Sequence, residues 1–145
     1  MKNIDILQIH ITVTASFLVF FGGGFVGGIL EWLLGSFDSL LYALFAFVVI
    51  DYLTGILLAI GEEKISSDIG FKGISKKVMI FAMISLGNII DHYILGSGSF
   101  LRSMLITFYL SNEGISILEN SAKMGVPFPE KLKSVLLQIN ETSKK

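Results

Sequence analysis

The amino-acid sequence predicts an all-α polytopic membrane protein, with about four transmembrane helices and a short amphipathic helix near the C-terminus. Its composition is apolar, because 52% of the 145 residues are hydrophobic and 16% are charged, against about 25% charged residues in soluble domains. The mean hydropathy is +0.73. The charges are clustered, and the stretches between them reach the ~20 apolar residues that a helix needs to cross a bilayer. We expect a single membrane domain over residues 1–145.

The first two predicted spans have the clearest boundaries. Residues 11–30 contain no charged side chain, and Glu31 ends this stretch. Residues 39–60 contain one charge, Asp51. A cleaved signal peptide is the alternative for the first stretch, but no small-x-small cleavage site precedes Glu31. We therefore expect the first stretch to remain as a transmembrane helix.

The third and fourth spans are predicted at residues 78–95 and 100–118. The third is almost uninterrupted in its apolar character. The fourth is less apolar, since Arg102 and Glu113 lie inside it. The alternative for this segment is a helix that lies flat at the membrane interface, which would leave three spans.

The placement of lysine predicts the topology, because cytoplasmic loops of membrane proteins retain lysine and arginine. With four spans and a cytoplasmic N-terminus, the outer connections are residues 31–38 and 91–98, which contain acids but no lysine or arginine. All the lysines then lie inside, including those of a tail at residues 121–145. A three-span chain would place a group of lysines outside. We therefore predict four spans, with both termini in the cytoplasm.

The first span contains glycines at the spacing that allows close helix packing. Gly23 and Gly27, and Gly24 and Gly28, are four residues apart, so each pair lies on one face of a helix. Small residues at this spacing let two helices approach closely in a membrane. The partner is either another helix of the same chain or a second copy. Gly55, in the second span, is a further candidate packing residue.

Asp51 lies near the middle of the second span. An aspartate at this depth costs about 2.5–3.5 kcal/mol on insertion scales, so it must face protein or water. It either makes a structural hydrogen bond to another helix, or lines a pore or an oligomer contact. A proton relay is a third, weaker interpretation.

The fourth span carries a polar stripe, because five polar residues recur at spacings that stack on one helix face. They are Arg102, Tyr109, Glu113, Ser116 and Asn120. A helix of this kind either lines an aqueous passage or lies at the interface. Arg102 and Glu113 are about three turns apart on the same helix. Each of these two charges therefore needs a partner elsewhere.

Residues 62–77 are expected to form a cytoplasmic loop between the second and third spans. Lys72, Lys76 and Lys77 would anchor the inner end of the third span to anionic lipid headgroups. The glycines around Lys72 do not form the G-x-x-x-x-G-K-[ST] pattern of a phosphate-binding loop.

The C-terminal tail predicts a short amphipathic helix that starts near Pro129. Its apolar residues recur at the i, i+3, i+4 and i+7 positions typical of one helix face; they are Leu132, Val135, Leu136 and Ile139. This helix would lie on the inner membrane surface or pack in an oligomer.

Little catalytic chemistry is available to the chain. It has no cysteine, which excludes disulfides, thiolate metal sites and thiol nucleophiles. The two histidines, His10 and His92, have no recognisable catalytic companion. The net charge of -1 gives no argument for a nucleic-acid partner. We therefore predict no catalytic residue, no metal site and no cofactor, and a membrane-embedded enzyme is the least favoured class.

Several segments, in order, resemble the toxin-secretion/phage-lysis holin family. The matching blocks are Asp-Tyr-Leu-Thr-Gly at 51–55, Lys-Ile-Ser-Ser at 64–67, Gly-Phe-Lys-Gly-Ile-Ser-Lys-Lys at 70–77, and the stretches 108–120 and 125–132. The resemblance covers about residues 38–137. The glycine-rich first span lies outside it.

The resemblance implies a holin, a protein that oligomerises in the bacterial cytoplasmic membrane and forms lesions or pores. Such lesions release an endolysin or a toxin, a functional partner that need not bind directly, and lead to host lysis or protein export. Two other functions stay open. One is an antiholin, a regulator that joins and blocks such pores. The other is a small proton- or cation-linked transporter or channel subunit that uses Asp51.

Overall fold

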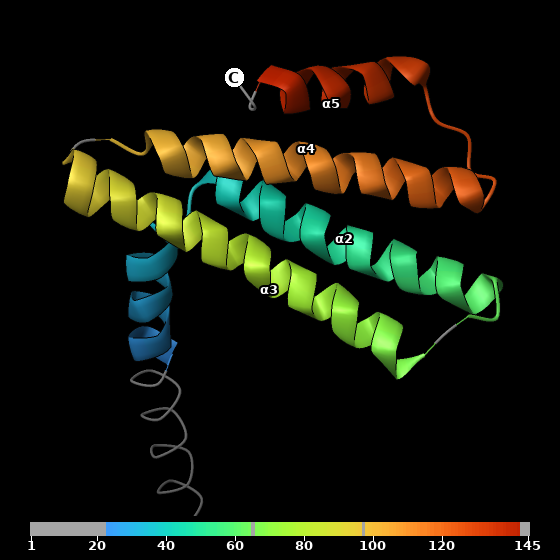
Figure 1. The fold of residues 1–145 in the computed structure, drawn as a ribbon, viewed down its shortest axis with the longest axis horizontal. Coiled ribbons are helices and arrows are strands. Elements are labelled where there is room, and N and C mark those ends of the chain that lie inside the picture. Colours follow the sequence, from blue (N-terminus) through green and yellow to red (C-terminus); the bar gives the residue numbers. More distant parts are fainter. Residues whose placement is uncertain (1–22, 65, 97, 143–145) are drawn as a thin grey trace, which may run out of the picture. The chain divides into compact units, whose positions relative to one another are not determined.

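The computed structural model describes residues 23–64, 66–96 and 98–142, and within these it is entirely helical, with no β-strand (Figure 1). The chain divides into two units, residues 1–36 and 37–145. The helices are Gly23–Leu34 in the first unit and, in the second, α2 (Ser39–Gly61), α3 (Ser67–Ile90), the π-helical turn Asp91–Leu95 that continues α3, α4 (Phe100–Lys123) and α5 (Glu130–Thr142). The all-helical prediction is confirmed.

The first predicted span falls partly outside the described residues, which begin at residue 23. Its remaining part belongs to the helix Gly23–Leu34, which continues past Glu31. Around Gly23, Gly24, Gly27 and Gly28, no atom lies within 4 Å of where a Cβ would stand. Among the described residues of its own unit, the glycine face of this helix is therefore open.

Two helices of the second unit are long and apolar enough to cross a membrane. These are α2 and the stretch Gly70–Leu95, with mean hydropathies of 2.3 and 1.7 over their most apolar windows. Only 22% of each window is buried. The core helix of a soluble protein buries most of its apolar surface, whereas these two expose theirs. Length, composition and exposure together indicate a membrane protein.

The N-terminus of α2 lies where the charge pattern predicts it. The Asp38 side chain accepts a hydrogen bond from the backbone N–H of Leu41, at 3.0 Å, and so caps the helix. The predicted span 39–60 is therefore confirmed as a helix, which runs from Ser39 to Gly61.

The expected loop at residues 62–77 is wrong for most of its length, because α3 begins at Ser67. Local and tertiary contacts both stabilise these early turns. Asp68 and Lys72 form an i,i+4 ion pair at 2.7 Å. A Cβ at Gly73 would lie 3.2 Å from the Tyr52 ring, so α2 and α3 approach closely there.

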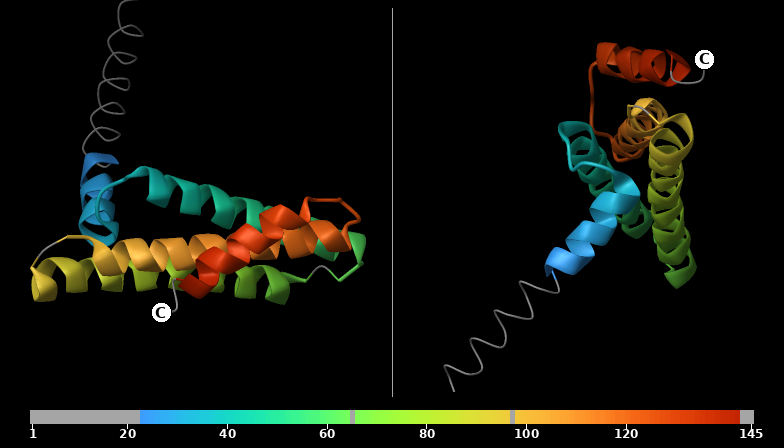
Figure 2. Two further views of the ribbon diagram at one scale, coloured as in Figure 1. Left: turned by 90° about the horizontal axis from the view of Figure 1, so that it is seen from above. Right: turned by 90° about the vertical axis from the view of Figure 1, so that its left-hand side faces the viewer.

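α4 is the central helix of the second unit, and it contacts α2, α3 and α5. Figure 2 shows α4 between α5 on one side and the pair α2 and α3 on the other. Its buried positions include both charged and apolar residues; they are Arg102, Ile106, Ser111, Glu113, Gly114 and Leu118. The fourth predicted segment is thus a helix, extended to Lys123, but it is not among the two that meet the membrane-span criteria.

Two glycines that the sequence reasoning did not select set the distances between helices. A Cβ at Gly87 of α3 would lie 2.6 Å from Leu105 Cδ1 and 3.3 Å from the backbone nitrogen of Arg102. A Cβ at Gly114 of α4 would lie 3.0 to 3.1 Å from Leu136 of α5 and 3.1 Å from Phe47 of α2. Glycine at these positions lets α4 pack closely against three neighbours. By comparison, a Cβ at Gly55 would make an ordinary van der Waals contact, with Asn120 Nδ2 at 3.8 Å.

Candidate functional site

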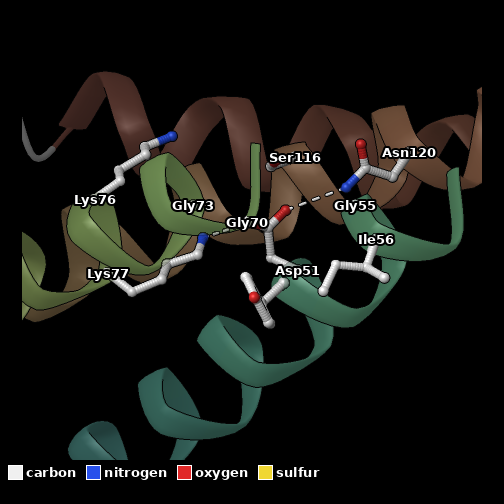
Figure 3. A pocket seen from close by; sticks show the side chains of 10 residues that line it. Asp51, Gly55, Ile56, Gly70, Gly73, Lys76, Lys77, Ser116 and Asn120 are labelled. Atoms are coloured by element: carbon white, nitrogen blue, oxygen red, sulfur yellow. Dashed lines mark hydrogen bonds and ion pairs between the residues drawn. The ribbon is translucent and has the colours of Figure 1, made fainter. Parts of the chain in front are cut away.

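A buried cluster of three charged side chains joins the three long helices, and Figure 3 shows two of them, Asp51 and Lys77. The ammonium group of Lys77, on α3, donates hydrogen bonds to Asp51 Oδ2 on α2 and to Glu113 Oε2 on α4. The exposed fractions of these side chains are 11% for Lys77, 10% for Asp51 and 2% for Glu113. We call Asp51, Lys77 and Glu113 the inner cluster. Because each helix supplies one charge, the cluster ties the register of α2, α3 and α4 together.

Neutral polar groups complete the hydrogen bonding of Asp51. Asn120 Nδ2 donates to Asp51 Oδ1 at 3.3 Å and to Thr54 Oγ1 at 3.1 Å. Thr54 Oγ1 in turn donates to the backbone carbonyl of Asp51 at 3.0 Å. Both carboxylate oxygens of Asp51 therefore accept hydrogen bonds inside the protein, which offsets the cost of burying the charge.

A pocket of about 220 Å³ opens beside the inner cluster (Figure 3). Small residues make the space, and polar side chains line it; the lining residues are Asp51, Tyr52, Gly55, Ile56, Gly70, Gly73, Lys76, Lys77, Ser116 and Asn120. A water molecule occupies about 30 Å³ in the liquid, so the pocket has room for several. A dashed line joins Lys77 to Asp51, whereas none joins Lys76 to any of the residues drawn (Figure 3).

A second cluster lies at the other end of α4 and contains Asp38, Asp91 and Arg102. Arg102 Nη1 donates to Asp38 Oδ2 at 2.6 Å. The two carboxylate oxygens of Asp91 accept from the backbone N–H groups of Leu101 and Arg102, at 3.1 and 2.8 Å. Asp91 thus satisfies two donors of the first turn of α4, where a negative charge is favoured by the helix dipole.

Arg102 changes the pKa of its partner, Asp38, which lies directly before α2. The hydrogen bond from Arg102 lowers the pKa of the Asp38 carboxyl below its ordinary value of 3.8. Arg102 itself is almost completely buried, with 3% of its side chain exposed. This end of the bundle is therefore held by a charged pair that persists at neutral pH.

α5 is attached to the middle of α4 by one apolar and one polar contact. Leu136 is buried over Gly114. Asn140 Nδ2 donates to Asn112 Oδ1. The side-chain oxygen of Asn140, Oδ1, is buried and has no hydrogen-bond partner among the described residues.

The structure brings together some of the predicted site residues and separates others. Glu113, Ser116 and Asn120 meet Asp51 at the inner cluster and its pocket. Arg102 lies at the opposite end of α4 with Asp38. Tyr109 is half-buried, with its ring 5.2 Å from that of Phe108, and belongs to neither cluster.

Lys77 requires a correction, because it was expected to anchor the membrane surface. Its ammonium points into the protein and pairs with two carboxylates, which leaves it only 11% exposed. The carboxylates of Asp51 on α2 and Glu113 on α4 attract this ammonium group into the protein. Lys72 remains exposed and pairs with Asp68, and Lys76 lines the pocket.

Sequence reasoning missed the partners of the predicted charges. Lys77 was not assigned to Asp51 or Glu113, Asp38 was not assigned to Arg102, and Asp91 was not identified as a cap. The sequence did indicate that Arg102 and Glu113 each need a partner from another part of the chain, and each has one. Among the described residues, no group of three His, Cys, Asp or Glu side chains is placed to hold a metal ion.

Comparison with known proteins places this arrangement in a family. A family model described as the bacteriophage holin family matches residues 28–141, which include both clusters and α5. The chain belongs to the bacteriophage holin family. Members of this family are non-enzymatic membrane proteins. No solved structure matches the chain.

Relatives of this holin-family chain include proteins of Clostridium perfringens, Listeria monocytogenes and Bacillus phage phi105. It is 40% identical over 116 residues to an uncharacterized 14.9 kDa protein in the nagH 3′ region of Clostridium perfringens, covering 79% of this chain and 87% of that one. It is 43% identical over 111 residues to an uncharacterized protein of Listeria monocytogenes, covering 77% and 79%. It is also 33% identical over 81 residues to a protein of Bacillus phage phi105 named a probable holin, covering 56% and 59%.

Proposed function

We propose that this chain is a holin, which oligomerises in the bacterial cytoplasmic membrane and forms lesions or pores that release an endolysin or a toxin. The observation that carries the proposal is the family match over residues 28–141. The two long apolar helices support it, because their side chains are mostly exposed and suited to lipid or to neighbouring protomers. The probable holin of Bacillus phage phi105 is a relative whose name states this function.

The proposed topology has four spans, at about residues 11–30, 39–60, 78–95 and 100–118, with both termini in the cytoplasm. The hydropathies of α2 and α3 support the second and third. The low hydropathy of α4 is compatible with membrane depth, because α2 and α3 cover it and its buried charges are paired. Polar groups within a bilayer are tolerated when they are satisfied inside the protein.

The position of α5 suggests which face of the protomer meets water. Leu136 contacts Gly114, near the middle of α4, so a docked α5 reaches membrane depth if α4 spans. The exposed surface of α5 carries polar side chains at helical spacing, Lys131, Ser134, Gln138 and Glu141, beside the exposed apolar Leu132, Val135 and Leu137. The polar side chains cannot face hydrocarbon without a large cost. We therefore place the α5 side toward a shared aqueous lumen, and the apolar faces of α2 and α3 toward lipid.

This arrangement revises the expected role of the polar stripe on α4. In the single chain, Arg102 and Glu113 are paired internally and buried, so the stripe stabilises the protomer. The open glycine face of helix Gly23–Leu34 is proposed as a contact between protomers. A shallow apolar groove of about 350 Å³ lies on that helix, and it is lined by Gly24, Phe25, Gly28, Ile29 and Trp32. Lys72 and Lys76 are proposed to meet lipid headgroups at the inner surface.

The experiment that tests the proposal is inducible expression in a bacterium, with membrane potential and culture density followed over time. A holin gives a quiet period, then abrupt depolarisation, and lysis only when a cytoplasmic endolysin is co-expressed. Growth with an intact potential, despite confirmed membrane insertion, would contradict the proposal. In that case, delayed lysis on co-expression with a known holin would identify an antiholin, and substrate-dependent flux would identify a transporter.

A further inference from the structure

We propose that the inner cluster is a proton-binding site, in which Asp51 and Glu113 together hold one proton beside Lys77. The starting observation is a charge imbalance. The cluster contains two carboxylates and one ammonium group, and both carboxylates contact the same ammonium nitrogen. Its other hydrogen-bonding members, Thr54 and Asn120, are neutral. With every group ionised, the cluster would carry one uncompensated negative charge. This inference does not depend on pore formation.

The surrounding elements supply no further ion pair to compensate this charge. On α3, Lys76 lines the same pocket and its charge acts on Glu113, but its side chain is exposed and forms no ion pair within the described residues. On α4, Arg102 is eleven residues from Glu113, about 16 Å along the helix at 1.5 Å per residue, and it pairs with Asp38. On α5, the charged side chains are exposed at the surface.

A buried excess charge is most easily removed by a proton. Like charges that share a site disfavour each other's ionisation, so one of two neighbouring carboxylates takes up a proton and the pair titrates as a unit. A proton on either Asp51 or Glu113 leaves one carboxylate, one ammonium and one neutral acid, which sum to zero. Loss of the Lys77 proton would be worse, because it would leave two unpaired carboxylates.

The adjacent pocket provides a route by which this proton can exchange. It has room for several water molecules, and both Asp51 and Lys77 line it. The hydroxyl of Ser116 also lines it and can accept the hydrogen bond that a protonated carboxyl donates. The site is therefore buried enough to favour the neutral state and open enough to equilibrate with water.

The proposal predicts the sign of a pH effect on the bundle. The folded protein binds one proton that the separated carboxylates of the unfolded chain do not hold at neutral pH. Stability therefore falls as the pH rises through the range in which the cluster releases its proton. Because the cluster joins α2, α3 and α4, this release loosens the contacts among all three helices.

Infrared difference spectroscopy of the full-length protein in lipid vesicles tests the site. A protonated carboxyl band that shifts in D₂O is expected at neutral pH in the wild type. Asp51→Asn and Glu113→Gln should each remove it, because either change leaves one carboxylate balanced by Lys77. Glu119→Gln, on the exposed face of α4, should retain it. Far-ultraviolet circular dichroism verifies that each variant is folded.

Three results would overturn the inference. If the wild type shows no protonated carboxyl band, the inference is overturned before any variant is measured. Loss of the band in only one of the two variants would assign it to a single isolated acid and not to a shared proton. Absence of the band together with a sodium-dependent melting temperature, lost in Glu113→Gln, would show that a metal cation balances the charge instead.

Discussion

Leu136 of α5 lies directly over Gly114 of α4, so that a Cβ at position 114 would come within 3.1 Å of both δ-carbons of the leucine. The same Cβ would lie 3.1 Å from the ring of Phe47 on α2. Glycine at this position therefore permits side chains of α5 and α2 to lie against the same spot on the α4 surface. Together with the Asn140–Asn112 hydrogen bond, this contact holds α5 on the central helix.

Gly114→Val should displace α5 from α4. The added methyl groups overpack a contact that has no free space, which costs about 1–3 kcal/mol. In a Leu136→Cys background, maleimide labelling should become faster when Gly114→Val is added. Gly61→Ala is the control, because no atom lies within 4 Å of a Cβ at Gly61. Equal labelling rates with and without Gly114→Val would contradict the assigned contact.

Lys77→Met should strongly destabilise the protein. It removes the cation and leaves two acids, Asp51 and Glu113, facing each other in a buried site; breaking a buried pair in this way costs about 3–5 kcal/mol. The measurement is denaturant unfolding in detergent micelles. Lys72→Met is the matched control on the same helix, since its pair with Asp68 is exposed and is worth about 0–1 kcal/mol.

A triple variant provides a second check on the inner cluster. Combining Lys77→Met with Asp51→Asn and Glu113→Gln removes every charge, so most of the lost stability should return. If the triple variant is as unstable as Lys77→Met alone, the loss comes from packing and not from charge.

Asp38→Asn should remove part of the acid sensitivity of the fold. Asn also caps helices well, so the change deletes the charge and keeps the cap. Because Arg102 lowers the pKa of Asp38, this pair contributes stability above pH 3.8, and the contribution is lost as the pH falls through the lowered value. At neutral pH the free energy of unfolding should fall by about 1 kcal/mol. This is the value of a charged hydrogen bond, reduced because 39% of the Asp38 side chain is exposed to solvent. Unfolding curves at neutral and acidic pH measure this loss. If acid lowers the stability of Asp38→Asn as much as that of the wild type, the assignment is refuted.

Cysteine labelling tests the proposed orientation of the protomer in the membrane, and the chain favours it because it has no native cysteine. Gln138→Cys on the outer face of α5 should react with a membrane-impermeant maleimide in assembled lesions. Leu57→Cys, on the exposed apolar face of α2, should stay unreactive because it faces lipid. Protection of residue 138 with labelling of residue 57 would reverse the proposed orientation.

Asp51→Asn should delay the onset of lysis at equal expression. In the variant, Lys77 and Glu113 form a neutral pair without the shared proton, so loss of that proton can no longer separate the helices of the closed protomer. Lysis time after induction, with co-expressed endolysin, is the measurement, and Glu119→Gln serves as control. Identical timing in the two variants and the wild type would exclude a role for Asp51 in assembly.

The sequence by itself determined the helical class, the position of α2 and the existence of α5. These features follow from local patterns: the apolar run that ends at Gly61, the cap at Asp38 and the helical spacing after Pro129. It also determined that Arg102 and Glu113 need partners, because two charges three turns apart on one helix cannot pair with each other. The ordered motifs carried the family resemblance, which the family match confirmed.

Only the tertiary structure decided which charges pair and which surfaces meet. Lys77 lies in a stretch whose composition is typical of a loop, yet it is helical and turned inward, because its partners belong to α2 and α4. Asp91 lies in a predicted outer connection, yet it caps α4. Gly87 and Gly114 have no local signature that separates them from other glycines. Helical periodicity specifies which face a residue occupies, but the neighbour of that face is set by the packing of helices distant in sequence.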